Sequence, residues 1–139
     1  MKLLMLFTAL LFSFSTAFAE DTDDLFVVLT SGDAETQMMA MVLATQSMNQ
    51  DVNVRVLLCS DAGELAVRGS ESPAFAPADR SPKQLLMGLL DRRATVEVCG
   101  IFLPNREYTS EDLIDGVGSA SPPEVAAFMK QEGVRYFTF

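Results

Sequence analysis

The segment 25–30 constrains the fold more than any other part of this chain. It reads Leu-Phe-Val-Val-Leu-Thr and is apolar almost without interruption. A strand with one face in water alternates apolar and polar residues, whereas a strand that is buried on both faces does not. Both faces are covered mainly in parallel sheets, because the helices that connect parallel strands lie on those faces. The segment therefore predicts a buried strand of a parallel sheet.

Further apolar runs alternate along the chain with segments of helical pattern. The predicted strands cover residues 25–30, 52–59, 94–99 and 134–139. The predicted helices cover residues 34–49, 81–93 and 110–115, and a last one runs from 122 to a stop at Gly133. Two capping-box patterns, Ser81-Pro82-Lys83-Gln84 and Ser121-Pro122-Pro123-Glu124, open two of these helices. This order predicts an α/β three-layer sandwich with a mostly parallel sheet.

The N-terminal residues have the pattern of an export signal. Lys2 precedes an apolar run over residues 3–14, and Ala17-Phe18-Ala19 follows it. This pattern predicts a secretory signal peptide over residues 1–19 that is cut after Ala19. A membrane anchor is the alternative, but a span needs about 20 apolar residues. We therefore expect a periplasmic or secreted chain, with one domain over residues 20–139 and no membrane contact after cleavage.

Charge and composition exclude several classes of function. The chain has 19 acidic and 10 basic residues, a formal net charge of −9, and no histidine. An acidic surface repels phosphate backbones, so we expect no nucleic-acid partner. Without histidine there are no Cys–His pairs, and most zinc sites are excluded. The carboxylates show no calcium-loop spacing, so we predict neither a metal site nor a cofactor.

Both cysteines fall where an open α/β sheet binds ligands, beyond the carboxyl ends of its strands. Cys59 ends the second predicted strand and Cys99 ends the third. Ser31 and Gly32 follow the first strand, and Asp61 follows the second, so these residues and Cys59 are our candidate substrate-binding residues beside Cys99. A phosphate loop at Ser31-Gly32-Asp33 is a weak alternative to a structural turn, since it lacks the glycine pattern of such loops.

The state of the two cysteines stays open in the sequence. A reactive thiolate needs a nearby cation or helix N-terminus. Arg106, the pair Arg92 and Arg93, and the helix that opens at Asp33 are the candidates. Buried cysteine is also a common packing residue. A disulfide needs Cα atoms within about 7 Å, and one intervening strand would place the two cysteines about 10 Å apart.

The strand that carries Cys99 also carries a family resemblance. The segments 25–33, 54–59, 81–93 and 96–100, the last reading Val-Glu-Val-Cys-Gly, are similar in order and length to the DsrE/DsrF-like family. The resemblance covers residues 25–139 and implies a flavodoxin-like topology and a homo-oligomer. In the sulfur-relay members, a cysteine at this position carries a persulfide between partner proteins. The resemblance thus implies Cys99 as the catalytic thiol, with a sulfur donor or acceptor protein as partner. Those relay members are cytoplasmic, whereas this chain has a predicted export signal.

Two function hypotheses follow from these observations. In the first, the chain is a periplasmic sulfur carrier or sulfurtransferase-like protein that holds a persulfide on Cys99, with Cys59 as a neighbouring or resolving thiol. In the second, it is a non-catalytic oligomeric binding module with structural cysteines. Its contact surface would then be the methionine-rich helix 34–49 and the irregular segment 68–80. The sequence alone does not decide between them, nor whether the chain is an enzyme.

Overall fold

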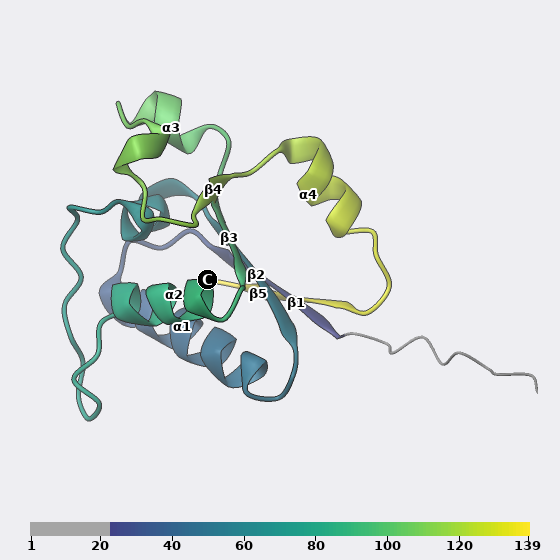
Figure 1. Cartoon of the computed structure of the whole chain (residues 1–139), viewed down its shortest axis with the longest axis horizontal. Helices are drawn as coiled ribbons and strands as arrows, with labels where there is room; N and C mark the ends of the chain where they lie inside the picture. Colours follow the sequence, from purple (N-terminus) through teal and green to yellow (C-terminus); the bar gives the residue numbers. More distant parts are fainter. Residues whose placement is uncertain (1–22) are drawn as a thin grey trace, which may run out of the picture.

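A single parallel sheet forms the centre of the computed structural model, which describes residues 23–139 (Figure 1). Five strands lie in the order β4-β3-β2-β1-β5, and every neighbouring pair is parallel. The strands are β1 (Asp24–Leu29), β2 (Asn53–Leu58), β3 (Thr95–Val98), β4 (Gly118–Ser119) and β5 (Val134–Thr138). The predicted α/β class is confirmed, and in the described part of the chain the sheet is wholly parallel.

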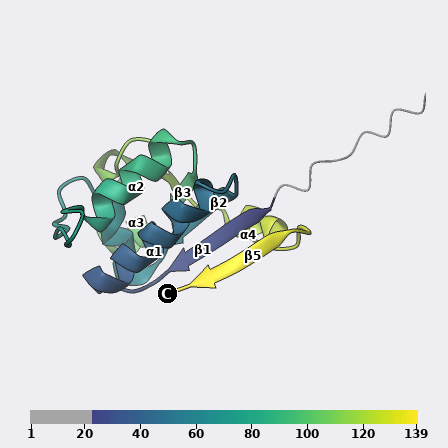
Figure 2. The same cartoon turned by 90° about the horizontal axis from the view of Figure 1, so that it is seen from below.

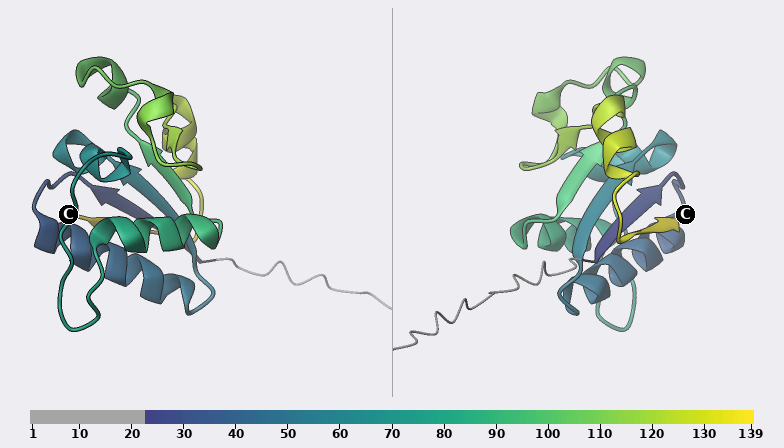
Figure 3. Two further views of the ribbon diagram at one scale, coloured as in Figure 1. Left: turned by 60° about the vertical axis from the view of Figure 1, so that its left-hand side comes forward. Right: turned by 90° about the vertical axis from the view of Figure 1, so that its right-hand side faces the viewer.

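Helices cover both faces of this sheet, which gives three layers. The α-helices are α1 (Ala34–Met48), α2 (Pro82–Asp91), α3 (Phe102–Asn105) and α4 (Pro122–Phe128), and the 3-10 helices are η1 (Ser60–Ala66) and η2 (Ser110–Asp112). Helices α1 and α2 lie side by side on one face, and α4 lies on the other (Figures 2 and 3). Strands β1 to β4 follow one another in one direction across the sheet, whereas β5 returns to the far side of β1. With crossovers of constant hand, this reversal places α4 on the opposite face.

The two faces bury unequal amounts of apolar surface. Leu25, Val27 and Leu29 of β1 belong to a large core cluster beneath α1 and α2. Phe26 belongs to a small cluster on the face of α4. Because successive side chains of a strand point to opposite faces, the unbroken apolar run of β1 fills both clusters. This confirms the doubly buried strand that the sequence predicts.

Several predicted elements end differently in the structure. The predicted helix over 110–115 is only the 3-10 turn η2, and the chain after Cys99 forms the short helix α3. Helix α4 ends at Phe128 rather than near Gly133, because the following residues turn toward β5. The Ser81 capping box is present, whereas Ser121 makes no side-chain cap hydrogen bond. Strand β4 has only two residues, too few for a sequence pattern.

The predicted signal peptide lies outside the residues that the structure describes, and so does the predicted cleavage after Ala19. Among residues 23–139, no helix is long and apolar enough to cross a membrane.

An ion pair joins the adjacent strands β2 and β3 on the face of α4. The Arg55 Nη2 of β2 lies 2.7 Å from the Glu97 Oε2 of β3, and both side chains are only 14% exposed. The Arg55 guanidinium carbon also lies 4.9 Å from the centre of the Phe128 ring in α4. One pair of charges thus connects β2, β3 and α4, and it lies on the same face of the sheet as Leu57.

We predict that Glu97→Ala destabilises the protein, because it leaves the Arg55 guanidinium largely buried without its carboxylate. Removal of one member of a buried pair costs about 3 kcal/mol. Urea unfolding followed by far-UV circular dichroism measures this cost. Asp115→Ala is the matched control, because it breaks the exposed Arg68–Asp115 pair, whose side chains are 52% and 92% exposed. Equal unfolding midpoints for the two variants would contradict the prediction.

Candidate functional site: the disulfide edge of the sheet

Strand pairing places the two cysteines directly opposite each other. The ladder between β2 and β3 ends with Leu58 beside Val98, and Cys59 and Cys99 are the next residues of the two strands. The Cys99 backbone N–H donates to the Leu58 carbonyl at 2.9 Å. The two Cα atoms are 5.1 Å apart and the side chains form a disulfide. In the described sheet no strand lies between β2 and β3, so the separation of about 10 Å that an intervening strand would impose does not arise.

The disulfide is half-buried and borders two hollows. A hollow of about 120 Å³ is lined by Cys59, Ser60, Cys99, Ile101, Phe102, Asn105 and Arg106. A second hollow of about 240 Å³, on the face of α4, is lined by Leu57, Cys99, Gly100, Ala120, Pro122, Val125, Ala126 and Met129. Cys99 lines both hollows and Cys59 only the first. Of the two cysteines, only Cys99 therefore adjoins the larger hollow.

Arg106 is the cation of the smaller hollow. Its guanidinium donates to an Asp61 carboxylate oxygen at 2.5 Å and to Glu64 at 3.3 Å. The hydrogen bond to Asp61 raises the pKa of Arg106. The Tyr108 hydroxyl donates to Glu64 at 3.0 Å, and this hydrogen bond raises the pKa of Tyr108. Two carboxylates of η1 thus hold a cation from the segment after β3 in the hollow that the cysteines line.

Of the other predicted sources of positive potential, the two arginines lie at the opposite ends of the strands and the helix N-terminus is capped. Arg92 and Arg93 precede β3 and so lie at the opposite edge of the sheet, where Arg92 donates to the Asn49 side chain at 2.8 Å. The prediction that they stabilise a thiolate is therefore wrong. Helix α1 is capped by Asp33, which accepts from the Thr36 backbone N–H at 2.8 Å. This hydrogen bond lowers the pKa of Asp33 and satisfies a donor of the helix N-terminus.

Gly32 and Asp61 come together in a separate hollow that neither cysteine lines. A Cβ on Gly32 would lie 2.8 Å from the Asp61 Cβ, so the loops after β1 and β2 touch only because residue 32 has no side chain. Both residues line a hollow of about 560 Å³ that Ser31 does not line. The Ser31 hydroxyl accepts from the Asp33 backbone N–H at 3.1 Å, as in a structural turn. A substrate role for these three residues stays a prediction.

The carboxylates near the disulfide do not form a metal centre. Within the described part of the chain, no group of three or more histidine, cysteine, aspartate or glutamate residues is placed to hold an ion.

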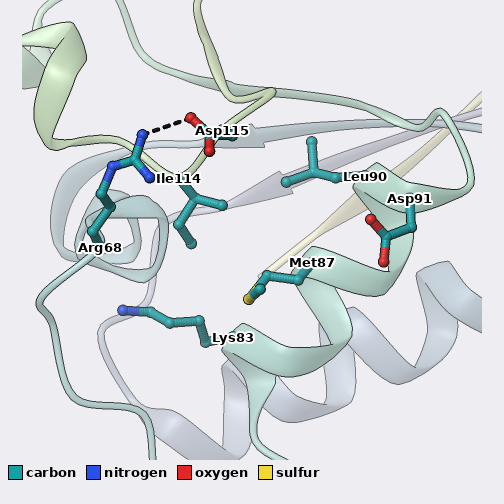
Figure 4. Close-up of a pocket in the computed structure, with 7 residues that line it drawn as sticks. All are labelled: Arg68, Lys83, Met87, Leu90, Asp91, Ile114 and Asp115. Carbon is teal, nitrogen blue, oxygen red and sulfur yellow. Dashed lines mark hydrogen bonds and ion pairs between the residues drawn. The ribbon is translucent and has the colours of Figure 1, made fainter.

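A further hollow of about 380 Å³ lies apart from the cysteines (Figure 4). It is lined by Arg68, Lys83, Met87, Leu90, Asp91, Ile114 and Asp115. Arg68 pairs with Asp115 at 2.6 Å across its mouth. The Lys83 ammonium donates to the Val67 carbonyl and to the Ser70 carbonyl and hydroxyl, each at 2.6 Å. Burial lowers the pKa of Lys83, and these bonds hold the start of the irregular segment 68–80 against α2.

Helix α3 and the turn before it supply residues of the disulfide hollow that the sequence analysis did not identify. The sequence pattern places Ile101, Phe102 and Asn105 in the exit from the third strand. Phe102 and Arg106 are four residues apart, and the guanidinium carbon lies 5.8 Å from the ring centre. Such spacing places two side chains on the same face of a helix. This spacing is the feature of the sequence that points to these residues. A helix of four residues is too short to give a detectable periodicity.

With this geometry established, comparison with known proteins places the chain in a class of small α/β proteins. The model of the DsrE/DsrF-like family matches residues 23–139, and the chain belongs to that family. Proteins of this family are linked in general to sulfur relay with partner proteins. The family prediction is therefore confirmed.

Two solved structures share the fold. The ychN protein from E. coli is 23% identical, with a TM-score of 0.70, and the match covers 85% of this chain and 99% of that one. The MTH1491 protein from Methanobacterium thermoautotrophicum is 18% identical, with a TM-score of 0.61 and a coverage of 84% and 97%. At these identities the likeness shows the fold alone. No curated protein matches the chain.

We predict that reduction of the disulfide lowers the free energy of unfolding by about 4 kcal/mol, because the bond closes a long loop in the unfolded chain. The two cysteines are 40 residues apart in the sequence. Guanidinium unfolding with and without a dithiol reductant measures the difference. The double variant Cys59→Ser/Cys99→Ser is the control, and its stability should not respond to the reductant. A wild-type midpoint that ignores reductant, although two thiols become titratable, would refute the prediction.

Proposed function

We propose that this chain is a periplasmic or secreted sulfur-handling protein that accepts sulfane sulfur on Cys99. The observation that carries the proposal is the position of Cys99. It lies at the carboxyl edge of the sheet, at the end of β3, and it lines two hollows. In the sulfur-relay members that the sequence resembles, the reactive thiol follows the corresponding strand. Reduced Cys99 then attacks a sulfane sulfur and holds it as a persulfide.

The disulfide sets a requirement on this chemistry. Both cysteines of the described chain form one disulfide. The protein can therefore accept sulfur only after that disulfide is reduced. The thiolate is the nucleophile in sulfur exchange, and a neighbouring cation favours it. Arg106 lines the same hollow as both cysteines and supplies that cation. The carboxylates of Asp61 and Glu64 fix its position and offset part of its charge.

Exposed apolar residues beside the hollows support docking of a partner protein. Ile101 borders the smaller hollow and is 74% exposed, and Met129 borders the larger one and is 46% exposed. Apolar residues of this kind recur at the centres of protein interfaces. The same surface suits either a sulfur donor protein or a second copy of this chain, in keeping with the expected homo-oligomer.

The alternative function is a non-catalytic binding module with a structural disulfide. One observation favours it. The disulfide links the ends of β2 and β3 and restrains the chain whether or not the cysteines react. The methionine-rich helix α1 gives it limited support, because Met41 is fully buried while Met39 is 52% exposed. The hollow in Figure 4 would be the ligand site of such a module, with Met87 as its exposed apolar residue. Lys83 holds Ser70, so the start of segment 68–80, the other expected contact surface, is fixed against α2.

Intact mass spectrometry after treatment with glutathione persulfide separates the two functions. The Cys59→Ser and Cys99→Ser variants are reduced, freed of reductant and treated in parallel. We expect Cys59→Ser to gain one sulfur atom that a reductant removes, because it retains Cys99, and Cys99→Ser to gain none. If neither variant gains sulfur until it is denatured, the sulfur-handling function is wrong and the binding module stands.

We also predict that Arg106→Gln slows formation of this adduct several-fold in the Cys59→Ser background, because the hollow loses its cation. The rate is measured by stopping the reaction at successive times and determining the fraction of protein with added sulfur by intact mass spectrometry. Arg92→Gln in the same background is the control, since it removes a cation at the far edge of the sheet. An equal effect of the two substitutions would show that net charge, not local position, governs the rate.

A further inference from the structure

We infer that Cys59 releases the sulfur held by Cys99 as hydrogen sulfide and that the protein is thereby a sulfane-sulfur reductase. The inference rests on the proposed function, because it concerns the fate of the Cys99 persulfide. Of the two roles that the sequence leaves open for Cys59, it selects the resolving thiol, and it names the released product. It also identifies the partner as a dithiol that reduces the Cys59–Cys99 bond.

The strand ladder supplies the geometry for this step. Cys59 and Cys99 follow the last paired residues of two adjacent parallel strands, and their Cα atoms lie 5.1 Å apart. Leu58 and Val98, which precede them, are fully buried, so the ladder is rigid up to the cysteines. The disulfide itself shows that the two sulfur atoms meet without an intermediate carrier. Once Cys99 carries a persulfide, the Cys59 thiol is therefore its nearest nucleophile.

The larger hollow gives the departing sulfur a route. It adjoins Cys99 and not Cys59, and its volume is about 240 Å³. The terminal sulfur of a Cys99 persulfide can occupy this space while Cys59 approaches from the side of β2. An intramolecular nucleophile held at bonding distance reacts far faster than a dissolved thiol at ordinary concentrations. We therefore expect the persulfide to be short-lived in the wild-type protein.

The chemistry balances in two steps. In the first, the Cys99 thiolate attacks the outer sulfur of a persulfide R–S–SH, the S–S bond of the donor breaks and R–S⁻ leaves. In the second, the Cys59 thiolate attacks the Cys99 Sγ, the bond from that Sγ to the outer sulfur breaks and HS⁻ leaves. The two cysteines lose two electrons and form the disulfide, and the sulfane sulfur gains those electrons. One persulfide and two protein thiols thus become one thiol R–SH, one hydrogen sulfide and one disulfide.

A dithiol reductant closes the cycle. Its first thiolate attacks the disulfide to form a mixed disulfide, and its second thiol resolves that intermediate, which restores both cysteines and oxidises the reductant. The half-buried disulfide borders hollows on both sides of Cys99, which gives such a partner access. The disulfide form of the protein is then the product of each turnover, and the same bond also restrains the fold.

The test follows both products after one addition of glutathione persulfide to reduced protein freed of reductant. Sulfide is trapped with monobromobimane, and the mass of the intact protein is measured by mass spectrometry under non-reducing conditions. Wild type should release about one sulfide per chain and become lighter by two hydrogen atoms, as for disulfide formation. Cys59→Ser should keep the added sulfur and release sulfide only at the level of buffer with donor. Cys59→Ala is run as a second variant, and circular dichroism checks that each protein is folded.

The outcomes separate this inference from the function on which it rests. If Cys59→Ser and Cys59→Ala gain no sulfur, the proposed function fails and the inference falls with it. If they gain sulfur and wild type holds the same adduct as long, without extra sulfide, Cys59 is not a resolving thiol and only this inference is overturned. Rapid loss of the adduct in wild type, with disulfide and sulfide in equal amounts, supports it.

Discussion

The pairing of β2 with β3 is the constraint on which the candidate site depends. Because Leu58 lies beside Val98 in a parallel ladder, the next residues of the two strands, Cys59 and Cys99, must meet at the carboxyl edge. The same adjacency lets Arg55 reach Glu97 on the face of α4. A register shift of one residue would turn these side chains to the opposite face and separate the cysteines. Backbone hydrogen bonds thus determine the sulfur chemistry that is available.

Unequal coverage of the two faces of the sheet determines how accessible the site is. Helices α1 and α2 bury the larger core, whereas the short helix α4 covers the other face, where both cysteines pack against the small cluster and Cys99 also contacts the large one. A thin cover leaves the disulfide half-buried between hollows instead of sealed within the core. Stability therefore resides mainly on one side of the sheet and access on the other. This division is consistent with a family that handles sulfur through contacts with other proteins.

Charge at the edge is arranged by ion pairs between η1 and the end of α3 rather than by a helix N-terminus. Arg106 is held by Asp61 and Glu64, so the cation that lines the smaller hollow with both cysteines is fixed but partly neutralised. Asp33, in contrast, satisfies its own helix. These pairings moderate the local potential at the edge. The rate of an exchange reaction between two neighbouring sulfur atoms depends more on their proximity than on the local electrostatic potential.

The sequence by itself determined the α/β class, the buried strand over 25–30 and the placement of both cysteines at one edge, because these follow from local periodicity and from the polarity of parallel strands. It also carried the resemblance to the DsrE/DsrF-like family. Only the tertiary structure decided that β2 and β3 are neighbours, that Cys59 bonds to Cys99, and that Arg106 rather than Arg92 lies beside them. Strand order and loop contacts join residues some forty positions apart, and no local pattern records which distant segments become adjacent.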